Sequence, residues 1–364
     1  MRIVILWFLV ISNTGVFAQW GLPRSGYDGQ QFTTFDVAGA GTGRFQGTIA
    51  TGINAGSVIT GYYLDVDGRA HGFVRAANGD ITKFDVTGTE VVETFATTLN
   101  ATQDIAGTYI DTSSLHHGFV RGVSGIITTF DAPGAAGGTT PSLINRTGQI
   151  AGYCMDAGSV FHGFVRQPDG VITTFDAPGA GTGANQGTQA YGINTAGVIT
   201  GFYSGPNNVH HGFVRAADGS MTTFNALGAG RGGYQGTEAY SINDAGSIAG
   251  RFFDGRNVAH GFGRDADGAI TRFDAPGAGT SANEGTFGSS INMGGAILGW
   301  IFTGTNTGRG FVRADGGVTA IFDVPGSGTV AAQGTVPASI NYVGFIAGTY
   351  IDSGYVYHGF KLAK

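Results

Sequence analysis

One three-residue motif, His-Gly-Phe, recurs along the chain at nearly constant spacing. It begins at His71, His117, His162, His211, His260 and His358, and a seventh copy reads Arg309-Gly310-Phe311. Successive copies are 46, 45, 49, 49, 49 and 49 residues apart. The dipeptides Phe-Asp and Ile-Asn recur in the same register, with one variant of each. Seven similar units in one chain predict a repeat architecture, in which each unit buries its apolar face against its neighbours.

A single unit contains four short segments with strand character and no helical periodicity. In the fourth unit we expect strands at residues 188–194, 198–203, 211–215 and 221–225. Asp218-Gly219 separates the last two and is a strong signal for a tight hairpin turn. A glycine-rich segment of about a dozen residues then leads to the next unit, which is the long connection that a radial arrangement of sheets requires. The sequence predicts an all-β fold, a seven-bladed β-propeller of four-stranded antiparallel blades.

The two ends of the repeat region hold complementary parts of one unit. The first repeat element, residues 32–36, corresponds to a fourth strand without its three partners, and the chain stops at Lys364 after a third strand. We expect this N-terminal strand to complete the last blade and close the ring, because closure removes the open sheet edges that promote aggregation.

The N-terminal residues have the pattern of an export signal. Arg2 precedes an apolar run of nine residues, and a small residue, Ala18, precedes Gln19. We therefore expect a signal peptide at 1–18, a linker at 19–30 and the propeller at 31–364. A nine-residue run is too short to span a bilayer. The protein is then secreted or periplasmic, without membrane insertion after cleavage. Its single cysteine, Cys154, is expected to be buried and inert.

Charge and motif content limit the possible partners. The net charge is −6 and the chain has no basic run, so the sequence lacks the electrostatic footprint of a nucleic-acid-binding protein. The Gly-x-Gly loops lead into strands, whereas phosphate-binding loops open helices. We expect no cofactor, no metal, no catalytic residues and a monomer. A glycan or an extracellular protein is the expected partner.

The in-register motifs resemble those of the HAF repeat extracellular proteins, a family named for a His-x-Phe motif. The resemblance covers about Gln31 to Lys364. It implies an exported bacterial protein with a propeller fold, and it carries no particular activity. The second copy departs from the pattern, because residues 86–95 lack the glycine-rich loop, and the sixth copy has Arg309 at the histidine position.

The recurring histidines are expected to be structural. Each begins a third strand and should lie opposite the aspartate that ends the fourth strand of its unit, in a hydrogen bond repeated by symmetry. The proposed pairs are His71 with Asp85, His117 with Asp131, His162 with Asp176, His260 with Asp274, Arg309 with Asp323 and His358 with Asp36.

Functional residues are expected on the face that carries the long glycine-rich loops, because loops tolerate variation and carry function. The chain has four glutamates, and we place them all on this face together with two aromatic residues that interrupt the loop pattern. The candidate ligand-binding residues are Phe45, Glu90, Glu93, Tyr234, Glu238 and Glu284.

Three functions remain open at this stage. The first is a secreted, non-catalytic binding or scaffold propeller, which predicts a near-regular ring with no unique cluster of strongly perturbed acids. The second is an exported polysaccharide-degrading enzyme, which needs two carboxylates about 5–10 Å apart at the channel mouth, with Glu90 and Glu93 as the candidate pair. The third is a structural repeat protein of an envelope matrix.

Overall fold

The computed structural model describes residues 31–88 and 90–363. The predicted signal peptide (1–18) and linker (19–30) lie outside the described residues. Every regular element in the described part is a β-strand, and the strands number 28. None of its elements is a helix able to cross a lipid bilayer.

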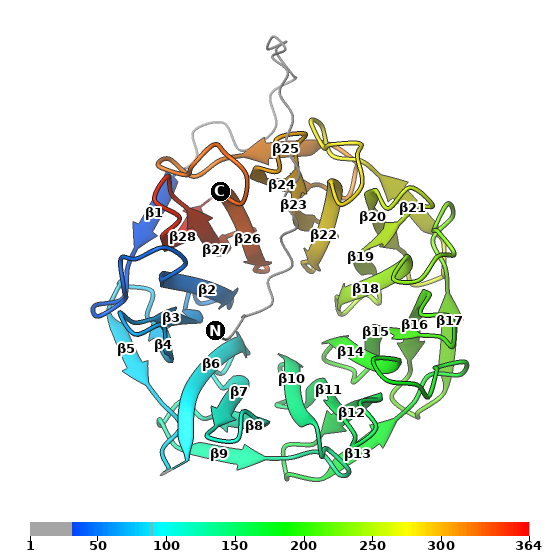
Figure 1. Cartoon of the computed structure of the whole chain (residues 1–364), viewed down its shortest axis with the longest axis horizontal. Helices are drawn as coiled ribbons and strands as arrows, with labels where there is room; N and C mark the ends of the chain where they lie inside the picture. The colour runs from blue at the N-terminus through cyan, green and yellow to red at the C-terminus, as the bar shows by residue number, and fades with distance from the viewer. Residues whose placement is uncertain (1–30, 89, 364) are drawn as a thin grey trace.

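The strands occupy four positions that run outward from the centre of the molecule (Figure 1). The inner strands are β2 (Gly47–Ile53), β6 (Val91–Leu99), β10 (Gly138–Ile144), β14 (Gly187–Ile193), β18 (Gly236–Ile242), β22 (Gly285–Ile291) and β26 (Gly334–Ile340). The second strands are β3 (Ile59–Leu64), β7 (Ile105–Asp111), β11 (Ile150–Met155), β15 (Ile199–Ser204), β19 (Ile248–Phe253), β23 (Ile297–Phe302) and β27 (Ile346–Ile351).

The third strands carry the His-Gly-Phe motif, and the outer strands end in the phenylalanine of Phe-Asp. The third strands are β4 (Ala70–Arg75), β8 (His116–Arg121), β12 (Phe161–Arg166), β16 (His210–Arg215), β20 (Ala259–Arg264), β24 (Gly308–Arg313) and β28 (Tyr357–Ala363). The outer strands are β5 (Ile81–Phe84), β9 (Ile127–Phe130), β13 (Ile172–Phe175), β17 (Met221–Phe224), β21 (Ile270–Phe273), β25 (Thr319–Phe322) and β1 (Gln31–Phe35). The boundaries expected for the fourth unit differ from these by one residue.

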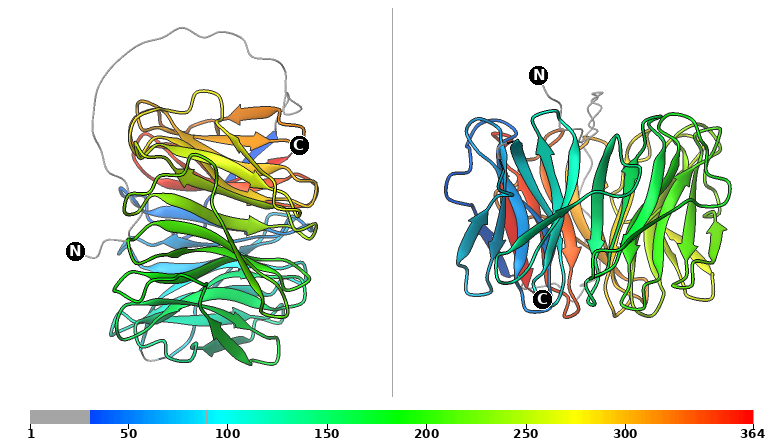
Figure 2. Two further views of the ribbon diagram at one scale, coloured as in Figure 1. Left: turned by 90° about the vertical axis from the view of Figure 1, so that its right-hand side faces the viewer. Right: turned by 90° about the horizontal axis from the view of Figure 1, so that it is seen from below.

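Antiparallel pairing joins the strands into four-stranded blades that stand side by side around the centre (Figures 1 and 2). In the blade β14–β17, each strand pairs with the next one along the chain. The C-terminal strands β26, β27 and β28 pair in the same way, and the neighbour of β28 is β1, with Thr33 opposite Lys361. Single-residue parallel bridges, such as Phe161 to Gly187, connect several adjacent blades, which links 24 strands into one sheet.

The His-Gly-Phe motif packs the blades against one another. Its phenylalanine is fully buried in every copy, as at Phe73 and Phe119. The ring of Phe84 lies on Gly72 of its own blade, where a Cβ atom would come within 2.8 Å of it. The same Phe84 ring meets Phe119 of the next blade edge to face, at 6.1 Å between centroids. Glycine is therefore required in the motif because it makes room for the ring that joins two blades.

The Ile-Asn motif forms a chain of hydrogen bonds around the centre. The Asn194 Oδ1 atom accepts the N–H of Val198 in its own turn, and its Nδ2 donates to the Asn243 carbonyl of the next blade. Each equivalent asparagine donates to the next one, and Asn341 donates to the Asn54 carbonyl at 2.9 Å. The donors are Asn54, Asn100, Asn145, Asn194, Asn243, Asn292 and Asn341. The motif therefore ties neighbouring blades together at their innermost turns.

We predict that Asn194→Ala lowers the free energy of unfolding by about 1–3 kcal/mol, because it leaves the Val198 N–H without its acceptor and removes the hydrogen bond from Asn194 to the next blade. Urea unfolding followed by circular dichroism measures the change. Asn207→Ala, at an exposed position, is the matched control and should change stability by less than about 0.5 kcal/mol. Equal effects of the two substitutions would contradict the structural role of the asparagine chain.

Candidate functional site

A cavity of about 440 Å³ lies at the centre of the molecule. Each inner strand has a register shift near its middle that leaves one residue without a partner in the second strand, and β6 has a further shift at Val92. These seven residues all line the cavity, and they are Thr51, Thr97, Ser142, Tyr191, Tyr240, Ser289 and Ala338. Bulges re-aim side chains at many functional sites. Here they direct one residue from every inner strand toward a shared space, which is within the usual size for a small-ligand pocket.

The cavity wall differs strongly from one side to the other. The blades of β2, β6 and β10 contribute Thr51, Thr97 and Ser142, which are small and carry hydroxyl groups. The blades of β14, β18 and β22 contribute two tyrosines, together with Arg251 from β19 and Trp300 from β23. Trp300 stacks on Phe287, with ring centroids 5.7 Å apart and planes 4° apart. The large aromatic residues therefore lie on one side of the cavity. Hydroxyl groups line both sides, because Ser241, Ser289 and Ser290 belong to the aromatic side. The other side also includes the apolar residues Ile53, Leu99 and Leu143.

Glu238 is buried behind the aromatic side, with only 4% of its surface exposed. Its Oε2 atom accepts the Arg251 Nε–H at 2.6 Å and the Tyr240 hydroxyl at 2.5 Å. Its Oε1 atom lies 2.7 Å from His210 Nδ1. Burial opposes the charge on Glu238, but the positive charge of Arg251 and these hydrogen bonds outweigh it and hold its pKa at about 2. Glu238 is therefore an ionised carboxylate at neutral pH, and both of its oxygens are hydrogen-bonded.

Arg251 is fixed on several sides. Besides its bond to Glu238, its guanidinium carbon lies 5.1 Å from the centre of the Tyr240 ring and 5.2 Å from that of Phe287. Burial disfavours the charged form of Arg251, but the Glu238 charge outweighs that cost and raises its pKa. The next tyrosine, Tyr191, donates its hydroxyl to Gln189 Oε1 at 2.9 Å. Glu238, Arg251 and Tyr240 therefore form a network of hydrogen bonds and ring contacts beside the cavity.

The residues proposed as ligand-binding do not form one site. Phe45 and Tyr234 are 42% and 61% exposed on loops that precede β2 and β18. Glu90 is exposed in the connection before β6, and Glu93 lies within that strand. None of these four residues lines the central cavity. The cavity is instead bounded by strand residues, as Thr51 and Tyr240 illustrate.

Glu238 and Glu284 are both buried, so neither side chain is free on the surface of the loop face. Glu238 lies in β18 and is bonded to Arg251. Glu284 accepts the N–H of Ser281 and stabilises its own loop, as Gln186 does for the N–H of Gly183 in another copy. The pKa of Glu238 is strongly lowered, but its hydrogen-bond partners are Arg251, Tyr240 and His210, so it does not belong to a cluster of acids.

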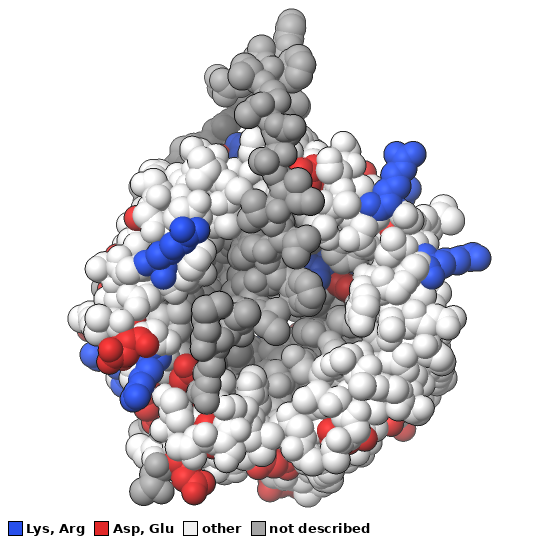
Figure 3. All heavy atoms as spheres, viewed as in Figure 1, with Lys and Arg blue, Asp and Glu red and all other residues white. Residues whose placement is uncertain are grey.

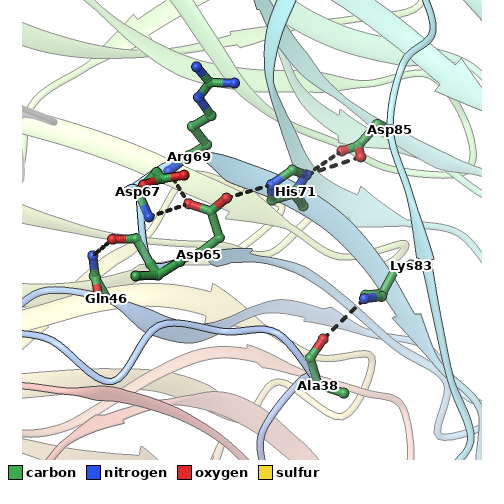
Figure 4. A network of polar contacts seen from close by, with 9 residues as sticks. Ala38, Gln46, Asp65, Asp67, Arg69, His71, Lys83 and Asp85 are labelled. Carbon is green, nitrogen blue, oxygen red and sulfur yellow. Dashed lines mark hydrogen bonds and ion pairs between the residues drawn. The ribbon is translucent and has the colours of Figure 1, made fainter.

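The structure brings together each histidine or arginine and aspartate that were proposed as partners. His71 Nδ1 lies 3.0 Å from an Asp85 oxygen (Figure 4). The corresponding atoms are 3.0 Å apart in His117–Asp131, His162–Asp176 and His358–Asp36, and 2.7 Å apart in His260–Asp274 and Arg309–Asp323. Each pair connects the third strand of a blade to the end of its outer strand.

A second aspartate near each of five histidines was missed in the sequence. Asp65 lies 3.3 Å from His71 Nε2, so the imidazole sits between two carboxylates (Figure 4). Equivalent contacts of 3.4–3.6 Å involve Asp111, Asp156, Asp254 and Asp352. The available signal was an aspartate six residues before the histidine in all five copies. These aspartates also accept backbone N–H groups in their own turns, as Asp65 does from Arg69, so each histidine is tied to a loop as well as to a strand.

These pairs predict a pH dependence of stability. The Asp36 hydrogen bond raises the pKa of His358, and the Asp274 hydrogen bond raises that of His260. A histidine with a raised folded-state pKa contributes stability below its unfolded pKa of about 6.5, and that contribution is lost as the pH rises through the folded value. We expect urea unfolding to show falling stability above about pH 6.5.

His358→Gln should reduce this slope. Arg309→His, which places a histidine beside Asp323, should increase it. Identical slopes in the wild type and both variants would contradict the predicted contribution of the pairs.

The charged residues on the face seen in Figure 3 lie mostly at its periphery, among many uncharged atoms.

Radial four-stranded blades around a central cavity define a β-propeller. No family model and no curated protein matches this chain.

Several solved structures are similar to the chain. A streptogramin B lyase superimposes with a TM-score of 0.57 at 13% identity, over 92% of this chain and 98% of that one. A structure from a study of two prolyl endopeptidases superimposes with a TM-score of 0.54 at 11% identity, over 88% of this chain and 50% of that one. The Aleuria aurantia lectin bound to Fucα1-6GlcNAc has a TM-score of 0.41 at 13% identity, over 82% of this chain and 97% of that one. At these identities, the first two superpositions show a shared propeller-like fold and nothing about activity.

Proposed function

We propose that this chain is an exported, non-catalytic glycan-binding protein, built as a seven-bladed propeller that the pairing of β1 with β28 closes. Its ligand occupies the central cavity and not the loop face. The observation that carries the proposal is the cavity wall, where Trp300, Tyr191 and Tyr240 face small hydroxyl-bearing residues such as Thr97 and Ser142. Sugars stack their apolar faces on aromatic rings, and their hydroxyls exchange hydrogen bonds with such groups.

The export signal pattern in the first eighteen residues and the resemblance to HAF repeat extracellular proteins support a location outside the cytoplasm. Against the polysaccharide-degrading alternative, a glycosidase needs a protonated general acid with a raised pKa and a second carboxylate nearby. Glu238 has a lowered pKa, and both of its oxygens accept hydrogen bonds. The described residues that line the cavity include no aspartate or glutamate.

Trp300 fluorescence offers a direct test of the proposal. The full chain contains Trp7, Trp20 and Trp300, so Trp7→Phe with Trp20→Phe leaves a single tryptophan in the cavity wall. We expect soluble oligosaccharides to change its emission in a saturable way, with affinities confirmed by calorimetry. Trp300→Leu in the wild-type background should abolish the calorimetric signal while the urea unfolding transition remains cooperative.

The double variant Phe45→Ala with Tyr234→Ala is the matched control for the loop face, and it should bind as the wild type does. Binding that is lost in this double variant and kept in Trp300→Leu would place the ligand on the loops and overturn the cavity assignment. No binding across neutral and acidic oligosaccharides would contradict glycan recognition and favour a structural role in the envelope matrix.

A further inference from the structure

The pair Glu238–Arg251 is an exception within a repeated fold. Glu238 is the third residue of its inner strand and lies opposite Arg251 in the second strand. The other copies have uncharged residues at these two positions. Their pairs are Ile49–Tyr62, Phe95–Thr108, Thr140–Tyr153, Gln189–Phe202, Phe287–Trp300 and Val336–Thr349. The blade therefore folds in six other copies without an ion pair at this place.

A buried ion pair is a poor way to stabilise a fold, because desolvation of the two charges offsets their attraction. Apolar or neutral residues of similar size would serve this blade as they serve its neighbours. The pair nevertheless stands beside the central cavity, and Arg251 reaches the cavity wall. Because the Arg251 charge lies at the cavity wall, where a bound ligand would contact it, we infer that the ion pair has a role in ligand recognition.

Arg251 lines the cavity, whereas Glu238 is buried behind it. Both carboxylate oxygens of Glu238 are taken by His210, Tyr240 and Arg251. Of the described residues that line the cavity, Arg251 is the one that carries a charge. The Glu238 bond uses the Nε–H of Arg251, and its two Nη groups carry the other four N–H donors in a planar fork that matches a carboxylate.

The fork is also held in place before any ligand arrives. Glu238 fixes Nε, and the rings of Tyr240, Phe253 and Phe287 lie 5.1–5.3 Å from the guanidinium carbon. A side chain already held in its binding geometry loses less rotational freedom when it binds. Trp300, stacked on Phe287, adds an aromatic platform next to the fork. An aromatic platform beside a fixed guanidinium suits a sugar ring that bears a carboxylate.

We propose that Arg251 selects a glycan that carries carboxylates, so that the ligand is an oligosaccharide of uronic acids, with Glu238 as the residue that positions Arg251. This inference rests on the proposed function and specifies its ligand class. Arg251 engages the carboxylate, the aromatic side stacks the sugar ring, and the hydroxyl groups on the opposite wall bind the sugar hydroxyls.

The test compares a charged oligosaccharide with two uncharged counterparts. An oligogalacturonide, its methyl ester and a neutral galacto-oligosaccharide of equal length are titrated into the full chain by calorimetry. We expect the acid to bind about ten- to a hundredfold more tightly than the ester, the range for hydrogen bonds to a charged group. Added NaCl should weaken binding of the acid more than binding of the ester. Oligomers of mannuronate and glucuronate, tested in parallel, identify the preferred sugar ring.

The variant Glu238→Val with Arg251→Thr transfers the pair found at Val336 and Thr349 to this blade. It should fold, retain binding of the neutral oligosaccharide and lose the preference for the acid. Equal affinity of the wild type for acid and ester, with clear binding of both, would overturn the inference and leave the proposed function intact. A preference for the acid that survives in the double variant would also overturn it. Absence of binding by every oligosaccharide would overturn both.

Discussion

Deletion of residues 31–36 is expected to abolish the stable monomer. These residues include β1, whose five positions pair with β28, and Phe32, whose ring lies 6.3 Å from those of both Phe322 and Phe360. Phe35 packs edge to face on Phe73 of the next blade. Full burial of two phenylalanines contributes roughly 3–6 kcal/mol, and even part of that for the half-buried Phe32 and Phe35 is a large share of the usual stability of about 5–15 kcal/mol. The deletion also exposes the edge of β28, and exposed edges pair with other chains.

Size-exclusion chromatography with light scattering and thermal unfolding measure this result. The deleted chain should aggregate or lose its cooperative transition, whereas Thr33→Ala, an exposed position on the same strand, should behave as the wild type. A monomeric deletion variant with an unchanged transition would show that β1 does not contribute to the stability of the ring.

Glu238→Ala is the single substitution expected to destabilise the protein most, by about 3–5 kcal/mol. It leaves the Arg251 charge without a counter-ion and removes the acceptor of the Tyr240 hydroxyl. Because the pKa of Glu238 is lowered to about 2, its contribution is present above an unfolded pKa of about 4.3 and is lost as the pH falls through the folded value. The difference between variant and wild type should therefore shrink between about pH 4.5 and 2.

The double variant Glu238→Val with Arg251→Thr is the matched control, because it removes both charges together. It should recover most of the lost stability in urea unfolding at pH 7, since replacing a buried ion pair by uncharged residues is often neutral. A double variant as unstable as Glu238→Ala would mean that the fold itself needs this ion pair, and the argument for a role in recognition would then fail.

The repeat period made the strands and their order predictable, because each unit carries its own turn and strand signals. The fourth unit shows this at the level of residues, where the expected strands lie within one residue of β14 to β17. The role of the asparagines was not predictable in this way, although one stands in the same place in every copy. Their hydrogen bonds cross between blades about 49 residues apart, as from Asn194 to Asn243, and local sequence patterns do not show such contacts.

The ion pair of Glu238 was not predictable for a similar reason. The position of Glu238 corresponds to the strand expected at 188–194 in the preceding unit, but its partner Arg251 lies thirteen residues later on the adjacent strand, and the repeat pattern does not show that contact. The cavity was also not predictable, because it depends on register shifts that point Tyr191 and Tyr240 toward the centre. A comparison of the inner-strand residue two positions before the register shift residue would have singled out Glu238 as the one charged residue among seven equivalents, which are Ile49, Phe95, Thr140, Gln189, Glu238, Phe287 and Val336.

Closure of the ring between the two ends of the chain can be measured by disulfide formation. Thr33 and Lys361 face each other in the pairing of β1 with β28, and opposed residues in antiparallel strands have Cα atoms about 4.5–5.5 Å apart, within disulfide range. In a chain with Cys154→Ala, the pair Thr33→Cys with Lys361→Cys should oxidise within the monomer, as peptide mass spectrometry would show. Thr34→Cys with Lys361→Cys should not, because Thr34 points to the opposite face. Free thiols in the first pair, or bonds only between chains, would contradict the closed propeller.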